Sequence, residues 1–152
     1  MERKLIIRNF GAIASADIAL KDFNIFIGEQ GAGKSTVAKL ITIFENSRDK
    51  VLKVDSDYLM TKFSEYNIIS YFNPDSYISY SSEQGDITYE DGSFNFTFSY
   101  HSTSHNLYIP AERFFISTFS RSIATLVLSK APIPVTLLEF ASFYEKAKNL
   151  FV

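Results

Sequence analysis

The stretch GEQGAGKST, residues 28–36, limits what this chain can fold into more than any other feature of the sequence. It fits the pattern G-x-x-x-x-G-K-[ST], in which backbone N–H groups converge on an anion and bulky side chains are excluded. A strand normally leads into such a loop, and a helix follows it and points its positive N-terminus at the same phosphates. The stretch therefore predicts a nucleotide-binding loop within an α/β fold.

The flanking sequence matches both expectations. An apolar run at residues 23–27 precedes the loop and indicates a strand. Apolar residues after the loop recur at the spacing of an amphipathic helix, which we expect to end near residues 46–47. These residues are Val37, Leu40, Ile41 and Phe44. The context favours nucleotide binding over a glycine-rich turn without a ligand.

The chemistry of the motif assigns a role to each part of the loop. Lys34 would reach the β- and γ-phosphate oxygens, and the Ser35 hydroxyl would ligate Mg²⁺. ATP and Mg²⁺ are accordingly the expected cofactors. The predicted nucleotide-binding residues are Gly28, Gln30, Gly31, Ala32, Gly33, Lys34, Ser35 and Thr36, with Ser35 also the metal ligand. No catalytic residue is predicted.

Strand patterns lie on both sides of the loop. Residues 4–8 and 14–20 indicate two strands joined by a turn at Asn9-Phe10-Gly11. Farther along, alternation with a period of two predicts a meander, and turn signals at residues 83–85 and 91–92 divide it. The expected meander strands are 76–82, 86–90 and 94–100, with a further short strand possible at 107–109.

Helical patterns return near the end of the sequence. Apolar residues from 115 to 127 form one helical stripe, and Pro132 and Pro134 interrupt it. A last helix is expected from Leu137 to the end of the chain. Residues 50–72 are ambiguous, since a short strand at 51–54 and a helix over 51–66 fit equally well.

Length and composition exclude several classes of function. With 152 residues, 46% of them apolar, the chain is long enough for one globular domain. A net charge of −2 without a long basic run argues against a dedicated nucleic-acid surface. Cysteine is absent, which excludes disulfides and thiolate chemistry. No apolar run approaches the roughly 20 residues that span a bilayer, and the start MERK is unlike a signal peptide, so we expect a cytoplasmic protein without membrane contact.

Groups that would activate water are harder to find than the loop. A Walker B strand is an apolar run ending in an acidic residue. Three runs come nearest to this pattern: residues 41–45 and 135–139 fall in predicted helices, and residues 51–55 are short and contain a lysine. The GTPase patterns D-x-x-G and N-K-x-D and an LSGGQ-like signature are also absent. The sequence thus predicts nucleotide binding and leaves turnover open.

Four segments together resemble the N-terminal half of an ABC-type ATPase head of the SMC/RecF/OLD-like group. They are LIIRNFGAI, NIFIGEQGAGKST, the antiparallel meander and YIPAERFFIS. The resemblance implies an α/β P-loop NTPase lobe with a mixed core sheet, an antiparallel β-meander side sheet and C-terminal helices. It implies one incomplete lobe over 1–152, with the nucleotide-binding sheet and loop helix in 1–110 and the start of a helical subdomain in 111–152.

The same resemblance implies what would complete the site. In that family two heads enclose ATP, and the other half of the chain supplies the signature, Walker B and switch histidine. We therefore expect a truncated chain, a homo-oligomer or a complementing ATPase half, with DNA contacts only through the full assembly. Arg113, Arg8 and Phe10 are further candidates for positions near the nucleotide, each with packing or solvation as the alternative.

Two other functions remain open at this point. One is a small P-loop kinase that uses Asp55 and Asp57 with Arg113 or Arg121 as a lid residue; a polar turn explains the two aspartates equally well. The other is a non-catalytic interaction module built on the Phe/Tyr-rich sheet. A metal site at His101 and His105 is disfavoured, because two histidines in a loop lack further converging ligands.

Overall fold

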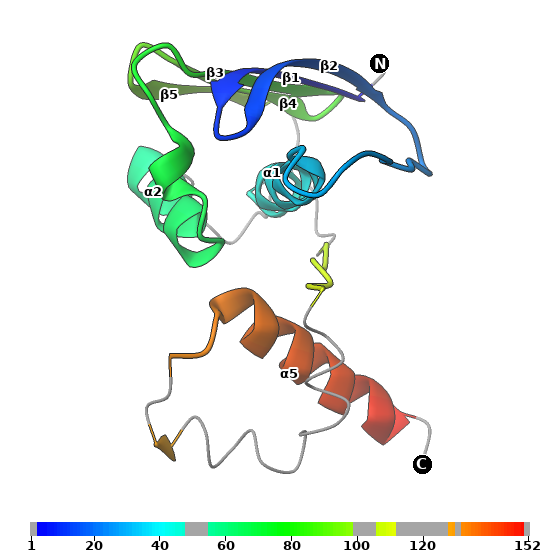
Figure 1. Cartoon of the computed structure of the whole chain (residues 1–152). Helices are drawn as coiled ribbons and strands as arrows, with labels where there is room; N and C mark the ends of the chain where they lie inside the picture. The colour runs from blue at the N-terminus through cyan, green and yellow to red at the C-terminus, as the bar shows by residue number, and fades with distance from the viewer. Residues whose placement is uncertain (1–2, 48–54, 99–105, 112–127, 130–131, 151–152) are drawn as a thin grey trace. The chain divides into compact units, whose positions relative to one another are not determined.

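The computed structural model describes residues 3–47, 55–98, 106–111, 128–129 and 132–150 (Figure 1). The chain forms two compact units, residues 1–106 and 107–152. The first unit contains a five-stranded sheet and the helices α1 (Lys34–Asn46) and α2 (Ser56–Glu65). The second contains α5 (Val135–Leu150). The described residues therefore form an α/β fold.

The sheet of the first unit is antiparallel throughout, in the order β2-β1-β3-β4-β5. Its strands are β1 (Arg3–Phe10), β2 (Ile13–Leu20), β3 (Tyr77–Ser82), β4 (Gly85–Glu90) and β5 (Ser93–Phe98). The predicted hairpin and meander are confirmed, with small shifts at the ends. The structure adds the pairing of β1 with β3, which are distant in sequence.

Local backbone chemistry explains the tight turns of this sheet. Between β4 and β5, Asp91 and Gly92 both have positive φ, at 51° and 78°. That conformation at both central residues matches the right-handed twist of a hairpin and favours Asp-Gly. Near the end of β1 and in the turn that follows it, Asn9 and Gly11 have φ of 49° and 57°. The turn signals read from the sequence are therefore real turns.

The two helices of the first unit lie on one face of the sheet (Figure 1). α1 ends at Asn46, as its apolar spacing predicts, and buries Val37, Leu40 and Phe44 on that stripe. α2 begins after Asp55, and the described part of the 50–72 region thus resolves as a helix followed by the short 3-10 helix η1 (Ile69–Tyr71). Residues 51–54, where a strand was the alternative, lie outside the described residues.

Aromatic rings fill the space between the helices and the sheet. Phe10, Phe44, Phe63 and Tyr80 are fully buried and meet edge-on or tilted, with ring centroids 5.7–6.1 Å apart where they touch. Phe94 of β5 joins them at 5.7 Å from Phe63. Such contacts add to the burial of apolar area, so the Phe/Tyr-rich composition is largely explained by the core.

The segment that leads into the phosphate loop differs from its prediction. Residues 24–29 form neither helix nor strand, and no described strand pairs with them. Their apolar side chains are exposed: Phe23 by 82%, Ile25 by 73% and Ile27 by 90%. Apolar character on both sides of an extended segment is typical of a strand buried on two faces. The described residues provide neither neighbouring strands nor cover for it.

The second unit is small within its described residues. α5 begins after Pro134, whose carbonyl accepts hydrogen bonds from the N–H groups of Leu137 and Leu138, and it buries Leu137 and Ala141. This confirms the predicted last helix. The tripeptide predicted as a possible strand, residues 107–109, is irregular. The helical stripe predicted at 115–127 lies outside the described residues.

Candidate nucleotide-binding site

Three glycines give the loop its shape. Gly28, Gly31 and Gly33 have φ of 152°, 83° and 86°, a region that side chains with a Cβ rarely adopt. Ala32 closes a turn within the loop by donating its N–H to the carbonyl of Glu29 at 3.4 Å. Positive φ at Gly31 and Gly33, on either side of Ala32, is the kind of backbone from which anion-binding nests are built.

Gly33 is also fixed by its surroundings. A Cβ atom on this residue would lie 2.5 Å from Cγ1 of Ile13, the first residue of β2. Any other residue type at this position would require the Ile13 side chain to move. The contact sets the distance between the phosphate loop and the antiparallel sheet.

The loop runs directly into the N-terminus of α1. Gly33 is the residue that precedes the helix, and no side chain caps the first turn. The Lys34 Nζ donates hydrogen bonds to the carbonyls of Gly28, at 2.8 Å, and Glu29. The lysine thus closes the loop across its own backbone, while the first N–H groups of the helix have no side-chain acceptor. An uncapped helix N-terminus is favourable for an anion.

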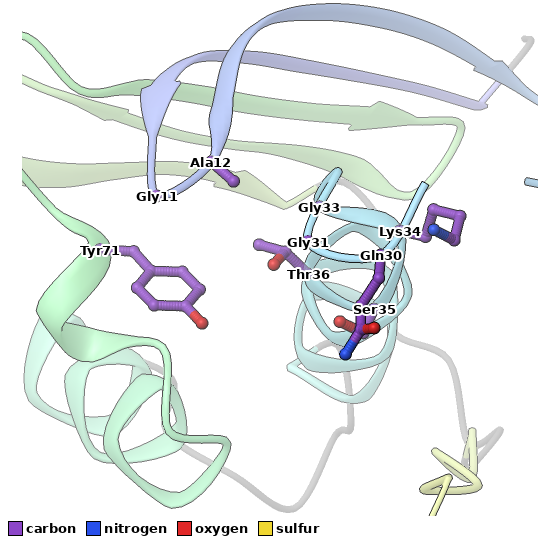
Figure 2. A pocket seen from close by; sticks show the side chains of 9 residues that line it. All are labelled: Gly11, Ala12, Gln30, Gly31, Gly33, Lys34, Ser35, Thr36 and Tyr71. Carbon is purple, nitrogen blue, oxygen red and sulfur yellow. The ribbon is translucent and has the colours of Figure 1, made fainter. Parts of the chain in front are cut away.

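A cavity of about 440 Å³ opens in front of this loop (Figure 2). Its lining residues come from the loop, from the β1–β2 turn and from η1. They are Gly11, Ala12, Gln30, Gly31, Gly33, Lys34, Ser35, Thr36 and Tyr71. The volume lies within the range of pockets for small molecules and cofactors. Six of the eight predicted site residues are therefore gathered at one cavity, and Gly28 and Ala32 belong to the same loop without lining it.

These residues fit a nucleotide and its magnesium ion. The left-handed glycines, the uncapped helix and the Lys34 ammonium suit a chain of phosphates. The Ser35 side chain is exposed at the second position of α1 and offers a hydroxyl oxygen. Groups of three or more acidic or histidine side chains that could hold a metal are absent from the described residues. Mg²⁺ would therefore depend on Ser35, phosphate oxygens and water, as is common for this ion.

Arg8 and Phe10 do not line the cavity. Phe10 is fully buried among Phe63, Tyr71 and Phe72. Arg8 donates to the backbone carbonyl of Ala16 at 2.9 Å and to the Asp17 carboxylate at 3.1 Å. Phe10 thus follows its packing alternative, and Arg8, expected to be solvated if it did not reach the nucleotide, is partly exposed and hydrogen-bonded on the sheet. The members of this turn that reach the cavity are Gly11 and Ala12.

The acidic candidates have structural partners. Asp55 accepts a hydrogen bond from the N–H of Tyr58 at 2.9 Å and caps α2, and Asp57 lies in the first turn of that helix. Neither residue lines the cavity. Glu45 lies on α1, is buried and accepts a hydrogen bond from the Tyr80 hydroxyl. Arg113, Arg121, His101 and His105 lie outside the described residues.

A scan against models of protein families matches residues 1–136 to the AAA ATPase domain. The chain belongs to the AAA ATPase domain family. Membership in that family carries a nucleotide-binding, ATPase-like function and the use of ATP. Searches of curated proteins and of solved structures find no match to this AAA ATPase domain. Among its described residues, no helix combines the length and apolar character needed to span a bilayer.

Sequence reasoning did not single out the far wall of the cavity. Gly11 belongs to a predicted turn, and neither Ala12 nor Tyr71 is part of a motif. Tyr71 is one of nine tyrosines and follows no motif. It reaches the site because the N–H of Gly11 donates to its carbonyl at 3.1 Å, beside the junction of β1 and β3. That contact between distant segments has no local signal.

Proposed function

We propose that this chain is the ATP-binding head region of an ABC-type ATPase of the OLD/RecF-like group. Residues 28–36 act as a Walker A loop for Mg-ATP. Backbone N–H groups of the loop and of the start of α1 bind the phosphates, Lys34 neutralises the β- and γ-phosphate oxygens, and Ser35 ligates Mg²⁺. The observation that carries the proposal is the left-handed glycine loop at an uncapped helix N-terminus, with Lys34 and Ser35 in one cavity.

Efficient hydrolysis requires groups beyond these 152 residues. A Walker B carboxylate and a signature segment orient water and neutralise charge in the proposed family, and neither pattern occurs in this sequence. Two of the three acidic runs, residues 41–45 and 135–139, lie wholly within the described residues, and neither supports such a role. Glu45 is buried beside Tyr80 on α1, and the run 135–139 lies within α5. The proposed activity of this region alone is binding with little turnover.

The core sheet of the proposed lobe would be completed by a complementing ATPase half or a second copy of the chain. Support comes from residues 23–27, where Phe23, Ile25, Phe26 and Ile27 are apolar and exposed and no described strand pairs with them. Strands on either side would cover these side chains and convert the all-antiparallel sheet of the described residues into part of a mixed assembly. DNA contacts, if the assembly makes them, belong to that complete form, and we place it in the cytoplasm.

Calorimetric titration of the full chain with Mg-ATP tests the proposal. Lys34→Ala removes a charge-assisted phosphate contact and is expected to weaken binding at least about tenfold. Lys4→Ala is the matched control, since Lys4 pairs with Asp17 on the sheet. Ser35→Ala should retain ATP affinity without metal and lose the gain that Mg²⁺ provides. Unchanged affinity in Lys34→Ala would refute the assignment.

A further inference from the structure

Tyr71 is held rigidly at the edge of the cavity. Its carbonyl accepts the N–H of Gly11 at 3.1 Å, and its ring lies edge-on to Phe10 with centroids 5.7 Å apart. A Cβ atom on Gly11 would lie 2.6 Å from Cδ2 of the Tyr71 ring, so glycine at position 11 leaves room for the ring. The ring is therefore positioned by the turn and by the aromatic core before any ligand arrives.

The part of the Tyr71 side chain that is not packed against the core lines the cavity. Its side chain is only partly buried, and its ring lines the wall formed with Gly11 and Ala12. Among the described residues its hydroxyl makes no hydrogen bond, although tyrosine hydroxyls near the interior usually have a partner. A rigid aromatic surface with an available hydroxyl is well suited to an amphipathic ligand.

The loop gives the cavity a direction. Lys34 and Ser35 define the end of the site that takes the terminal phosphates and the metal. Figure 2 shows the Lys34 side chain and the Tyr71 ring on opposite sides of the first turn of α1, with Thr36 on the side that faces the ring. A nucleotide with its γ-phosphate at Lys34 therefore directs its sugar and base toward Gly11, Ala12 and Tyr71.

We propose that Tyr71 is the nucleoside-binding residue of this site. Its ring packs against the ribose and the face of the base, and its hydroxyl hydrogen-bonds to the ribose. Gly11 and Ala12, without bulky side chains, leave space beside the ring for the sugar. This inference rests on the proposed binding of ATP by the loop. It assigns a ligand contact to a residue outside the phosphate-binding motif.

Comparison of ATP with inorganic tripolyphosphate separates this inference from the function on which it rests. Both ligands carry the phosphate chain, and only ATP carries a nucleoside. Titrations would be performed with the full chain, the magnesium complexes of both ligands, and the variants Tyr71→Leu and Lys34→Ala. Tyr58→Leu is the control, because Tyr58 lies on α2 away from the cavity.

Tyr71→Leu is expected to weaken ATP about tenfold, the loss typical of an aromatic contact with a base, and to change tripolyphosphate affinity less than twofold. Lys34→Ala should weaken both ligands, and Tyr58→Leu neither. If the wild type binds neither ligand, the proposed function itself fails. If Tyr71→Leu weakens both ligands equally, or neither, the nucleoside assignment fails while the phosphate site stands.

A second measurement covers the case in which Tyr71→Leu disturbs the aromatic core. In the wild-type chain with Mg-ATP, nuclear Overhauser effects are expected between the Tyr71 ring protons and the ribose H1′ and base H8 protons. Tyr71→Phe identifies the ring signals while retaining the contact with Phe10. The absence of those effects in a saturated complex would overturn the proposal.

Discussion

Ile13 packs directly against Gly33, so that a Cβ atom on Gly33 would lie 2.5 Å from the Cγ1 atom of Ile13. The first residue of β2 and the last glycine of the phosphate loop thus fix each other. Gly31 has a similar φ of 83°, yet a Cβ there would meet nothing within 4 Å. A substitution at Gly31 therefore tests backbone strain alone, whereas the same substitution at Gly33 tests strain together with a steric clash.

Gly33→Ala is expected to lower the free energy of unfolding by roughly 3 kcal/mol, because backbone strain adds to a clash with β2. Gly31→Ala should lower it by about 1 kcal/mol through strain alone. Urea denaturation of both variants measures the difference. In a chain that carries Ile13→Ala, the Gly33→Ala substitution should cost less stability, because the clash is removed and only the backbone strain remains. Equal losses in the two single variants would contradict the role of Ile13.

Tyr80→Phe is expected to destabilise the first unit by about 1–3 kcal/mol. The Tyr80 hydroxyl donates to the buried carboxylate of Glu45, which also lies near Arg3 with an Nη1–Oε1 distance of 3.7 Å. Removing the donor leaves a buried acceptor less satisfied. Thermal unfolding provides the measurement. Tyr77→Phe is the control, since no hydrogen bond joins that hydroxyl to another described residue, and it should change stability little.

Arg8→Ala is expected to raise the pKa of Asp17. In the folded chain the hydrogen bond from Arg8, followed by a smaller contribution from Lys4, holds the pKa of this carboxyl below its usual value. β1 and β2 pair Ile6 with Asp17, so the two basic side chains flank the carboxylate from the same strand. Carboxyl-carbon NMR titration should show a clear rise in Arg8→Ala and a smaller rise in Lys4→Ala. A larger rise in Lys4→Ala would contradict the order.

The direction of this pKa shift also sets the pH dependence of stability. Since the folded-state pKa of Asp17 lies below its unfolded-state value, the pair stabilises the fold above the unfolded-state pKa. The contribution is lost as the pH falls through the folded-state pKa. Arg8→Ala should therefore flatten the stability profile in that acidic window and leave its shape near neutral pH unchanged. Denaturation at a series of acidic pH values checks this.

Ile27→Ser is expected to change the unfolding free energy of the isolated chain by no more than about 0.5 kcal/mol, because the side chain is 90% exposed. Ile7→Ser, at a residue that is 0% exposed in β1, should cost at least about 3 kcal/mol. Ile27→Ser should also reduce binding of an apolar dye. A large loss of stability in Ile27→Ser would mean that residues 23–27 are already covered in solution.

Most of the fold of the first unit follows from local sequence. A few neighbouring residues are enough to predict the conformation of the loop glycines, the Asp91-Gly92 turn and the apolar stripe of α1. The structure agrees with these predictions. The strand predicted at 23–27 failed for a physical reason. Its apolar pattern is typical of a strand that is buried between neighbouring strands. The described residues contain no strand that pairs with it.

The site was predictable only on its phosphate side. The motif names residues 28–36 because backbone geometry and charge there follow from residue type. The opposite wall depends on the pairing of β1 with β3, which brings the segment before β3 beside the β1–β2 turn. Tyr71 is one aromatic residue among many, and only that pairing distinguishes it from the rest of the core.

The β1–β2 turn has a consequence for the dynamics of the sheet. Asn73 and Ser76 both donate to the carbonyl of Asn9, and Gly11 donates to that of Tyr71, so the turn joins the sheet to one wall of the cavity. A ligand that bridges the phosphate loop and that wall would have to be released before β1 and β3 could separate. Saturating nucleotide at a hundred times its Kd would slow amide hydrogen exchange in those strands about a hundredfold. The nucleotide would then stabilise the pairing of β1 with β3 without contacting either strand.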